Sequence, residues 1–282
     1  MAYRFLRFPG GVGKAVTLSY DDGPVYDVQL AEIIDRHGLK CTFNLNSKWL
    51  HLERKIKVEQ IKNFLDNGHE VAVHGAEHLA NGLVDPIDGI RDVLECREVL
   101  ESTFARIIRG MAYPDCGVNR FSPGIDYGTV RNYLKNLGIV YARVAGGDND
   151  RFELPSDWLR WVPTVHHINP ELMDYVDRFL NINVNAPYHA DRHPRLFYLW
   201  GHSYEFNDMD NWDLLENVSA KLGGRDDIWY ATNIEIYDYV TAYTSLIRSA
   251  DGRRVYNPNV IPVWFTESGQ TYCVNPGEEL VI

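Results

Sequence analysis

The stretch Ala15-Val-Thr-Leu-Ser-Tyr-Asp-Asp-Gly-Pro24 decides the fold that we expect for this chain. Its apolar, β-branched and aromatic residues are typical of a buried strand, and Gly23 and Pro24 turn the chain after it. Two adjacent carboxylates, Asp21 and Asp22, end the strand, where their burial is costly without a cation or hydrogen-bond donors nearby. Active sites of parallel α/β folds gather at such strand ends, so the pair indicates a site, with a divalent metal as one compensating charge. The alternative is a turn in which an Asp caps the next helix.

The rest of the chain alternates between short apolar runs and amphipathic segments. Strands are expected at 41–46, 69–74, 106–114, 139–143, 161–167, 196–202 and 228–232, and helices at 27–37, 54–67, 86–101, 126–137, 170–181, 211–222 and 233–248. This alternation predicts parallel strands joined by helical crossovers. For a chain of 282 residues, we therefore expect an α/β fold, a distorted (β/α)7–8 barrel.

The pattern changes near residue 250. Segments 257–265 and 271–274 are rich in strand-forming residues and flank a Gly-containing turn, which is typical of a β-hairpin. We expect residues 1–250 to form the catalytic barrel and residues 251–282 to form a C-terminal β-hairpin appendage packed on it.

The composition indicates which partners and which cellular compartment the protein is expected to have. A formal net charge of −11 argues against nucleic acid and anionic membrane surfaces, which both require a basic patch. No apolar run approaches the roughly 20 residues that span a bilayer, and the N-terminus lacks the apolar core of a signal peptide. The four cysteines show no CxxC spacing, which favours free thiols in a cytoplasmic protein. A secreted protein that has lost its signal is the alternative, and the oligomeric state is not predictable.

His74-Gly-Ala-Glu-His78 follows the expected strand at 69–74. Two imidazoles and a carboxylate are suitable ligands for Zn²⁺ or a similar ion and leave positions open for water. The same five residues match the H-x-x-E-H signature of zinc proteases, which needs one continuous helix with Glu77 as the base. Residues 71–74 look like a strand and Gly75 opposes a helix, so we favour the metal site without the protease. Two structural histidines are the remaining alternative.

Three motifs in this chain resemble those of the polysaccharide deacetylases, a carbohydrate esterase family. Ser19-Tyr-Asp-Asp-Gly-Pro24 is similar to the family's T-F-D-D-G-P motif, and His74-x-x-x-His78 is similar to its H-S/T-x-x-H motif, with Gly75 at the Ser or Thr position. Leu199-Trp-Gly-His202 resembles its late L-x-x-H segment. The resemblance extends over residues 12–245 and agrees with the expected barrel.

The resemblance implies a role for each matched residue. Asp21 would be the general base that activates a metal-bound water, and His202 would be the general acid that protonates the leaving amine. Asp22, His74 and His78 would hold a divalent metal, zinc in the first place, with cobalt or nickel as alternatives. The implied function is metal-dependent removal of acetyl groups from N-acetylated carbohydrate, with O-acetylated carbohydrate as a variant.

The third family motif, R-P-P-Y, is altered in this chain. It supplies an Arg near the base and a backbone donor to the oxyanion. In residues 110–117, Pro114 is kept, but Ala112 stands at the Arg position. Arg109 and Arg143 are both candidates to replace the missing guanidinium.

Asp157-Trp158 is a candidate for the fourth motif. Trp158 and Trp161 are either a platform for sugar or part of the core, and we favour the core. His166 and His167 have no role that the resemblance assigns. If they alternate along a strand, only one of them faces the site.

Two other functions fit parts of this pattern. Related barrels hydrolyse small cyclic amides and imides, and the altered third motif leaves room for a metal-dependent amidase or imidase on a small C–N substrate. A catalytically inactive barrel that only binds carbohydrate is the other candidate. A binding module has no need of the five residues Asp21, Asp22, His74, His78 and His202, which argues against it.

Overall fold

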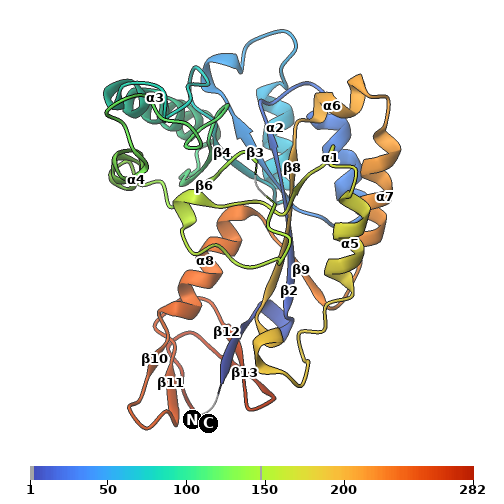
Figure 1. Cartoon of the computed structure of the whole chain (residues 1–282), viewed down its shortest axis with the longest axis vertical. Coiled ribbons are helices and arrows are strands. Elements are labelled where there is room, and N and C mark those ends of the chain that lie inside the picture. The colour runs from blue at the N-terminus through green and yellow to red at the C-terminus, as the bar shows by residue number, and fades with distance from the viewer. Residues whose placement is uncertain (1–2, 147) are drawn as a thin grey trace.

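A parallel β-sheet forms the centre of the protein, which is described here from a computed structural model for residues 3–146 and 148–282 (Figure 1). The strand order is β6-β5-β4-β3-β2-β8-β7, and β9 also pairs with β2. The strands span Lys14–Asp21 (β2), Cys41–Leu45 (β3), Glu70–Val73 (β4), Gly110–Ala112 (β5), Tyr141–Arg143 (β6), Val165–His166 (β7), Arg195–Gly201 (β8) and Ile228–Tyr230 (β9). Every strand pair in this sheet is parallel, as the alternating sequence pattern predicts.

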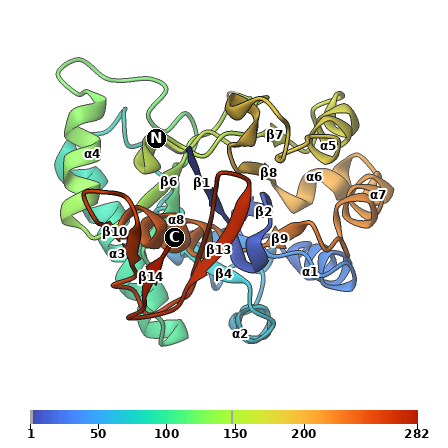
Figure 2. The ribbon, with the colours of Figure 1, turned by 90° about the horizontal axis from the view of Figure 1, so that it is seen from below.

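Helices surround this sheet. They span Asp27–Arg36 (α1), Val58–Asp66 (α2), Pro86–Phe104 (α3), Tyr127–Asn136 (α4), Leu172–Leu180 (α5), Ser203–Asp208 (α6), Trp212–Leu222 (α7) and Asn233–Thr244 (α8). Seen from below, α4, α3, α2, α1, α7 and α5 follow one another around the strands (Figure 2). Short 3₁₀ turns lie at Pro9–Gly11, Ser47–Trp49, Trp158–Arg160 and His189–Arg192.

Strand β2 is the central strand, and all eight of its residues are buried. It pairs with β8 along one side. On the other side it pairs with β9 at Lys14–Val16 and with β3 at Leu18–Asp21. A strand covered on both sides and both faces must be continuously apolar, which explains the run that precedes Asp21.

The barrel is closed only weakly between β6 and β7. A single parallel bridge, between Arg143 and Trp161, joins the β6 edge to the segment that precedes β7. The expected α/β fold with a distorted (β/α) barrel is confirmed, and this weak junction is the distortion.

Several boundaries differ from the sequence prediction. The strand expected at 161–167 is reduced to the two residues of β7, because Trp161 bridges to β6 and Pro163 has no N–H to donate. The strand expected at 106–114 is limited to the three residues of β5. The helix expected from residue 54 begins at Val58, since Lys55 instead forms a bridge with Pro24.

The end of the last long helix also differs. Helix α8 ends at Thr244, and Ile247–Arg248 forms strand β10 in place of its expected last turn. Helix α6 was not expected at all. It begins directly after β8 and ends at Asp208, where a positive φ at Asp210 turns the chain into α7.

Two small antiparallel sheets stand apart from the barrel sheet. The predicted hairpin is present as β12 (Val263–Glu267) and β13 (Gln270–Val274). It is joined by β1 (Arg4–Arg7) from the N-terminus, a pairing that the sequence did not indicate. The second sheet combines β10, β11 (Arg254–Tyr256) and β14 (Glu279–Val281). Val255, Phe265 and Val274 bury their side chains against α8 in one cluster, which fixes both sheets to the barrel domain.

Two further observations concern the chain as a whole. In the described residues, no helix is long and apolar enough to cross a bilayer. The four cysteines are free thiols, and Cys41 and Cys96 are buried.

Candidate active site

The predicted site residues meet at the carboxyl edge of the sheet. Asp21 is the last residue of β2, His74 follows β4 and His202 follows β8. Because parallel strands end at one common edge, residues more than a hundred positions apart are brought together. The same edge adds Asn44 from β3 and Arg143 from the end of β6.

Asp22, His74 and His78 form a compact group of potential metal ligands. Asp22 Oδ1 lies 3.6 Å from Nε2 of His74 and 3.6 Å from Nε2 of His78. The chain reaches this arrangement through left-handed backbone conformations at Asp22 (φ 74°), Gly75 (φ 75°) and His78 (φ 62°). Such conformations are unfavourable for Asp and His and persist where the surroundings hold them, which is common at functional sites.

The donor set of this group fits a divalent metal. Asp22 Oδ1 is buried and has no hydrogen-bond partner in the described part of the chain. His74 Nδ1 lies 3.0 Å from the carbonyl oxygen of Ala112, which orients Nε2 toward Asp22. Two imidazoles and one carboxylate with open positions are typical of catalytic zinc, and the contact from Ala112 is the outer support that such ligands require. Asp22, His74 and His78 would therefore hold the ion.

Trp49 supports the half-exposed ligand His78. The indole stacks on the His78 ring at a centroid distance of 5.3 Å. Lys55 Nζ lies 4.2 Å from the centroid of the same indole and donates to the backbone oxygen of Asp22 at 2.8 Å. The stack fixes the orientation of the one ligand that the barrel core does not enclose.

Asp21 is ionised although it is buried. Its Oδ2 forms an ion pair with Arg143, and its Oδ1 accepts a hydrogen bond of 2.8 Å from Asn44 Nδ2. Burial by itself would raise the pKa of Asp21, but Arg143, His74, His202 and the Asn44 amide lower it to about 2. The carboxylate is thus available as a base at any ordinary pH.

The structure distinguishes between the two candidate arginines. Arg143 contacts Asp21, and its guanidinium Cζ lies 4.2 Å from the centroid of the Trp200 ring. Arg109 instead forms a bidentate ion pair with Asp238 of α8, at 3.1 and 2.6 Å. Arg143 from β6 therefore supplies the guanidinium that the altered third motif lacks at Ala112.

His202 lies beside Oδ2 of Asp21, the same oxygen that His74 approaches. Its Nε2 lies 4.0 Å from Asp21 Oδ2, and its Nδ1 lies 3.3 Å from Glu205 Oε2. Burial would lower the pKa of His202, but Glu205 and Asp21 together raise it above its ordinary value. A histidine that keeps its proton near neutral pH is suited to general acid catalysis.

Glu205 was missed in the sequence. It is the third residue of α6, and its carboxylate also accepts the backbone N–H of His202 at 3.0 Å, which completes a capping box. A Glu three residues after a helix N-cap is the recognised signal for this arrangement. The signal was not used because α6 itself was not expected.

Other candidate residues lie outside the site. Glu77 is exposed and pairs with Lys48, and residues 74–78 form no helix, so the zinc-protease geometry is absent. Asp157 caps the 3₁₀ turn at Trp158–Arg160 and bonds to Tyr127. Trp158 packs edge-on against Trp161, which is 1% exposed, so both belong to the core as favoured.

The expectation that only one of His166 and His167 faces the site is wrong. Strand β7 ends at His166, so the two residues do not alternate along a regular strand. Both Nε2 atoms lie close to Glu205 Oε2, at 3.4 Å for His166 and 3.3 Å for His167.

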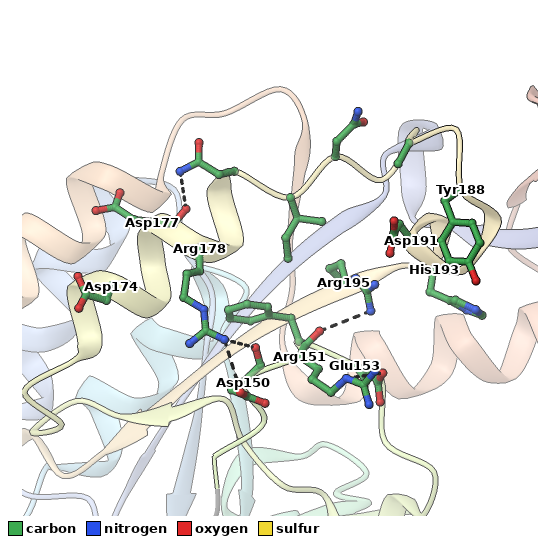
Figure 3. Close-up of a pocket in the computed structure, with 15 residues that line it drawn as sticks. Asp150, Arg151, Glu153, Asp174, Asp177, Arg178, Tyr188, Asp191, His193 and Arg195 are labelled. Carbon is green, nitrogen blue, oxygen red and sulfur yellow. Dashed lines mark hydrogen bonds and ion pairs between the residues drawn. The ribbon is translucent and has the colours of Figure 1, made fainter.

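A cavity of about 1140 Å³ lies away from this site. Figure 3 shows its charged lining, which includes Asp150, Asp177 and Arg178. Arg195, another lining residue, is the first residue of β8, so the cavity lies toward the amino ends of the strands, opposite His202. Arg178 pairs with Asp150 across it, which leaves no arrangement of base and acid like that at Asp21.

Comparison with known proteins agrees with the motifs. Residues 10–142 match the model of the polysaccharide deacetylase family. The match includes Asp21, Asp22, His74 and His78, and the resemblance noted in the sequence is thereby confirmed. No curated protein matches the chain.

Solved structures share the fold at low sequence identity. A Mycobacterium smegmatis protein assigned to the polysaccharide deacetylases has 18% identity and a TM-score of 0.59, and the match covers 88% of this chain and 99% of that one. The chitin deacetylase of Colletotrichum lindemuthianum has 19% identity and a TM-score of 0.51, with 79% and 87% covered. The chain spans only 55% of the Streptococcus pyogenes deacetylase PplD, at 15% identity, a TM-score of 0.40 and 46% of this chain covered.

Proposed function

We propose that this protein is a metal-dependent hydrolase that removes acetyl groups from N-acetylated carbohydrate. The observation that carries the proposal is the position of Asp21. Its carboxylate is held by Arg143, and its Oδ2 lies 3.9 Å from Nε2 of His74 and 4.0 Å from Nε2 of His202. One oxygen of the proposed base thus lies close to a proposed metal ligand and to the proposed acid, which supports the hydrolysis of an amide.

Asp21 takes a proton from the attacking water. A carboxylate with a pKa near 2 is a weak base, so the water itself must be made acidic. A divalent metal, zinc in our proposal, supplies this by lowering the pKa of water and by polarising the acyl oxygen. Arg143 and Asn44 hold both oxygens of Asp21, so the base cannot rotate away from the water.

His202 gives a proton to the departing nitrogen. An amine leaves only when protonated, so an acid must be in place on the side away from the water. Glu205 binds Nδ1 of His202 and leaves Nε2 pointing toward Asp21 and the space where substrate would react. The raised pKa of His202 keeps that proton available at neutral pH.

Acetate release tests the proposal. The purified protein with one equivalent of zinc is incubated with N-acetylglucosamine oligomers and, for the O-acetyl variant, with acetylated xylan. We expect acetate from the wild type and none from Asp21→Asn, with zinc still bound to that variant. His37→Ala, which alters a histidine paired with Glu216 away from the site, is the matched control and keeps its activity.

The outcomes separate the alternative functions. Bound metal without acetate release favours the amidase or imidase, which is then assayed on a cyclic amide or imide. A protein that binds no metal favours the inactive carbohydrate-binding barrel. Near-full activity of Asp21→Asn would show that the base is assigned to the wrong residue.

A further inference from the structure

His166, His202 and Glu205 form a second group of potential metal ligands beside the first. Glu205 Oε2 lies 3.4 Å from His166 Nε2 and 3.3 Å from His202 Nδ1. One ligand atom from each of the three residues lies within 4.8 Å of the other two. The group shares no residue with Asp22, His74 and His78. It uses Nδ1 of His202, whereas Nε2 of the same ring faces Asp21.

Rigid elements hold these three side chains in place. His166 lies opposite Trp200 in the parallel pairing of β7 with β8. His202, two residues after Trp200, is the N-cap of α6, and the capping box fixes Glu205. Side chains on the ends of paired strands and in a helix cap are preorganised, which favours ion binding.

The two separations from Glu205 match those between ligands of one zinc ion, and the third, between His166 and His202, is no more than 4.8 Å. Bonds of 2.0–2.2 Å in a tetrahedron place neighbouring ligand atoms about 3.4 Å apart. A direct N–H···O bond is shorter, with 2.7–3.2 Å as the usual range. The contacts of Glu205 Oε2 to His166 and His202, at 3.4 and 3.3 Å, are longer than this range; the His202 contact is a long hydrogen bond, and both separations are also suitable for a shared cation.

His167 provides an independent observation. Its side chain is fully buried between Tyr20 and Phe206, with ring-centroid distances of 5.6 and 4.0 Å. Neither of its ring nitrogens has a hydrogen-bond partner in the described part of the chain, although Nε2 lies 3.3 Å from Glu205 Oε2. A buried imidazole without a partner is costly. An ion at Glu205 would give His167 Nε2 a partner.

We propose that His166, His202 and Glu205 bind a second divalent ion, of which zinc suits the ligands best, and that filling this site inhibits the hydrolase. The ion would take Nδ1 of His202 and release the proton of that nitrogen to solvent. At His166, whose Nδ1 accepts the backbone N–H of Ile168 at 3.2 Å, the ring proton would move from Nε2 to Nδ1 and that hydrogen bond would be given up, which frees Nε2 for the ion. The His202 ring then carries one proton, on Nε2, and cannot become an imidazolium. Giving up that last proton would leave an imidazolate, so the acid is weakened. The site does not depend on the proposed function, but its effect on turnover does.

Zinc counting tests the site without reference to activity. The full chain is stripped of metal with a chelator and titrated with zinc, and bound zinc is measured by calorimetry and elemental analysis. We expect two ions for the wild type, one for His166→Ala and one for His74→Ala. His37→Ala, which removes a different histidine that contacts a carboxylate at 2.7 Å, should still bind two.

Acetate release in excess zinc tests the inhibition. Saturating the second site should slow the wild type roughly 100-fold, the order of loss expected when a general acid is removed. For His166→Ala, the ratio of the rates at one equivalent and in excess zinc should be close to one.

The results separate the two proposals. Equal zinc binding by wild type and His166→Ala would overturn the second site, and acetate release would then leave the deacetylase proposal standing. Two bound ions at saturation, together with no acetate release at one equivalent of zinc, would support the site and reject the deacetylase. Two bound ions with undiminished turnover in excess zinc would overturn the inhibition.

Discussion

Replacing Arg143 with Met should change both the stability of the protein and the pH dependence of its activity. The pKa of Asp21 is about 2 against an ordinary 3.8, which corresponds to a preference of about 2 kcal/mol for the charged form. Arg143 lowers this pKa more than any other group, and both partners are almost fully buried. Breaking such a pair leaves an uncompensated buried charge, at a cost of about 3–5 kcal/mol.

The sign of the pH effect follows from the direction of the shift. A carboxyl group whose pKa is lower in the folded state stabilises the fold above its unfolded pKa of about 3.8, and this contribution is lost as the pH falls toward 2. In Arg143→Met, the guanidinium no longer offsets the effect of burial on the Asp21 carboxylate, so the pKa of Asp21 rises. We expect the acid limb of kcat/KM to move upward by a pH unit or more, on the order of the lost interaction.

Arg109→Met is the matched control. Arg109 and Asp238 are both about one-third to one-half exposed, so their ion pair contributes about 1 kcal/mol or less. The assay is kcat/KM for acetate release from pH 2 to 9, with chemical denaturation of each variant alongside. The reasoning is refuted if Arg109→Met shifts the acid limb and Arg143→Met leaves it in place.

Three other predictions concern the surrounding groups. His74→Ala should lower the zinc content measured by elemental analysis, because two ligands remain of three. Glu205→Gln should lower the pKa of His202 and move the alkaline limb of kcat to lower pH, because the carboxylate that raises that pKa is removed; an unmoved limb would show that Glu205 only caps α6. Asp27 is fully buried, and burial outweighs its hydrogen bond from Ser203, so its pKa is about 8. An acid with a raised pKa in the folded state makes stability fall as the pH rises from about 4 toward 8, so Asp27→Asn should remove a decline of a few kcal/mol seen by denaturation of the wild type.

The sequence by itself determined the architecture and which residues form the candidate metal-binding group. The apolar run before Asp21 and the strands and helices that follow have local patterns, and their alternation leaves few topologies open. Asp22 and His74 follow strands directly, so knowing that the strands are parallel is enough to bring them together, and His78 lies four residues after His74. These features depend on residues close in sequence.

Only the tertiary structure decided which residues support the base and the acid. Arg109 precedes β5 and therefore lies at the amino edge of the sheet, whereas Arg143 ends β6 at the carboxyl edge beside Asp21. The expected strand at 106–114 was too long to show this difference. Glu205 and His166 reach His202 because β7 pairs with β8 and an unexpected helix follows. These contacts depend on where each strand ends and on which strands pair with each other. Both are set when the whole sheet packs, so they cannot be predicted from one segment alone.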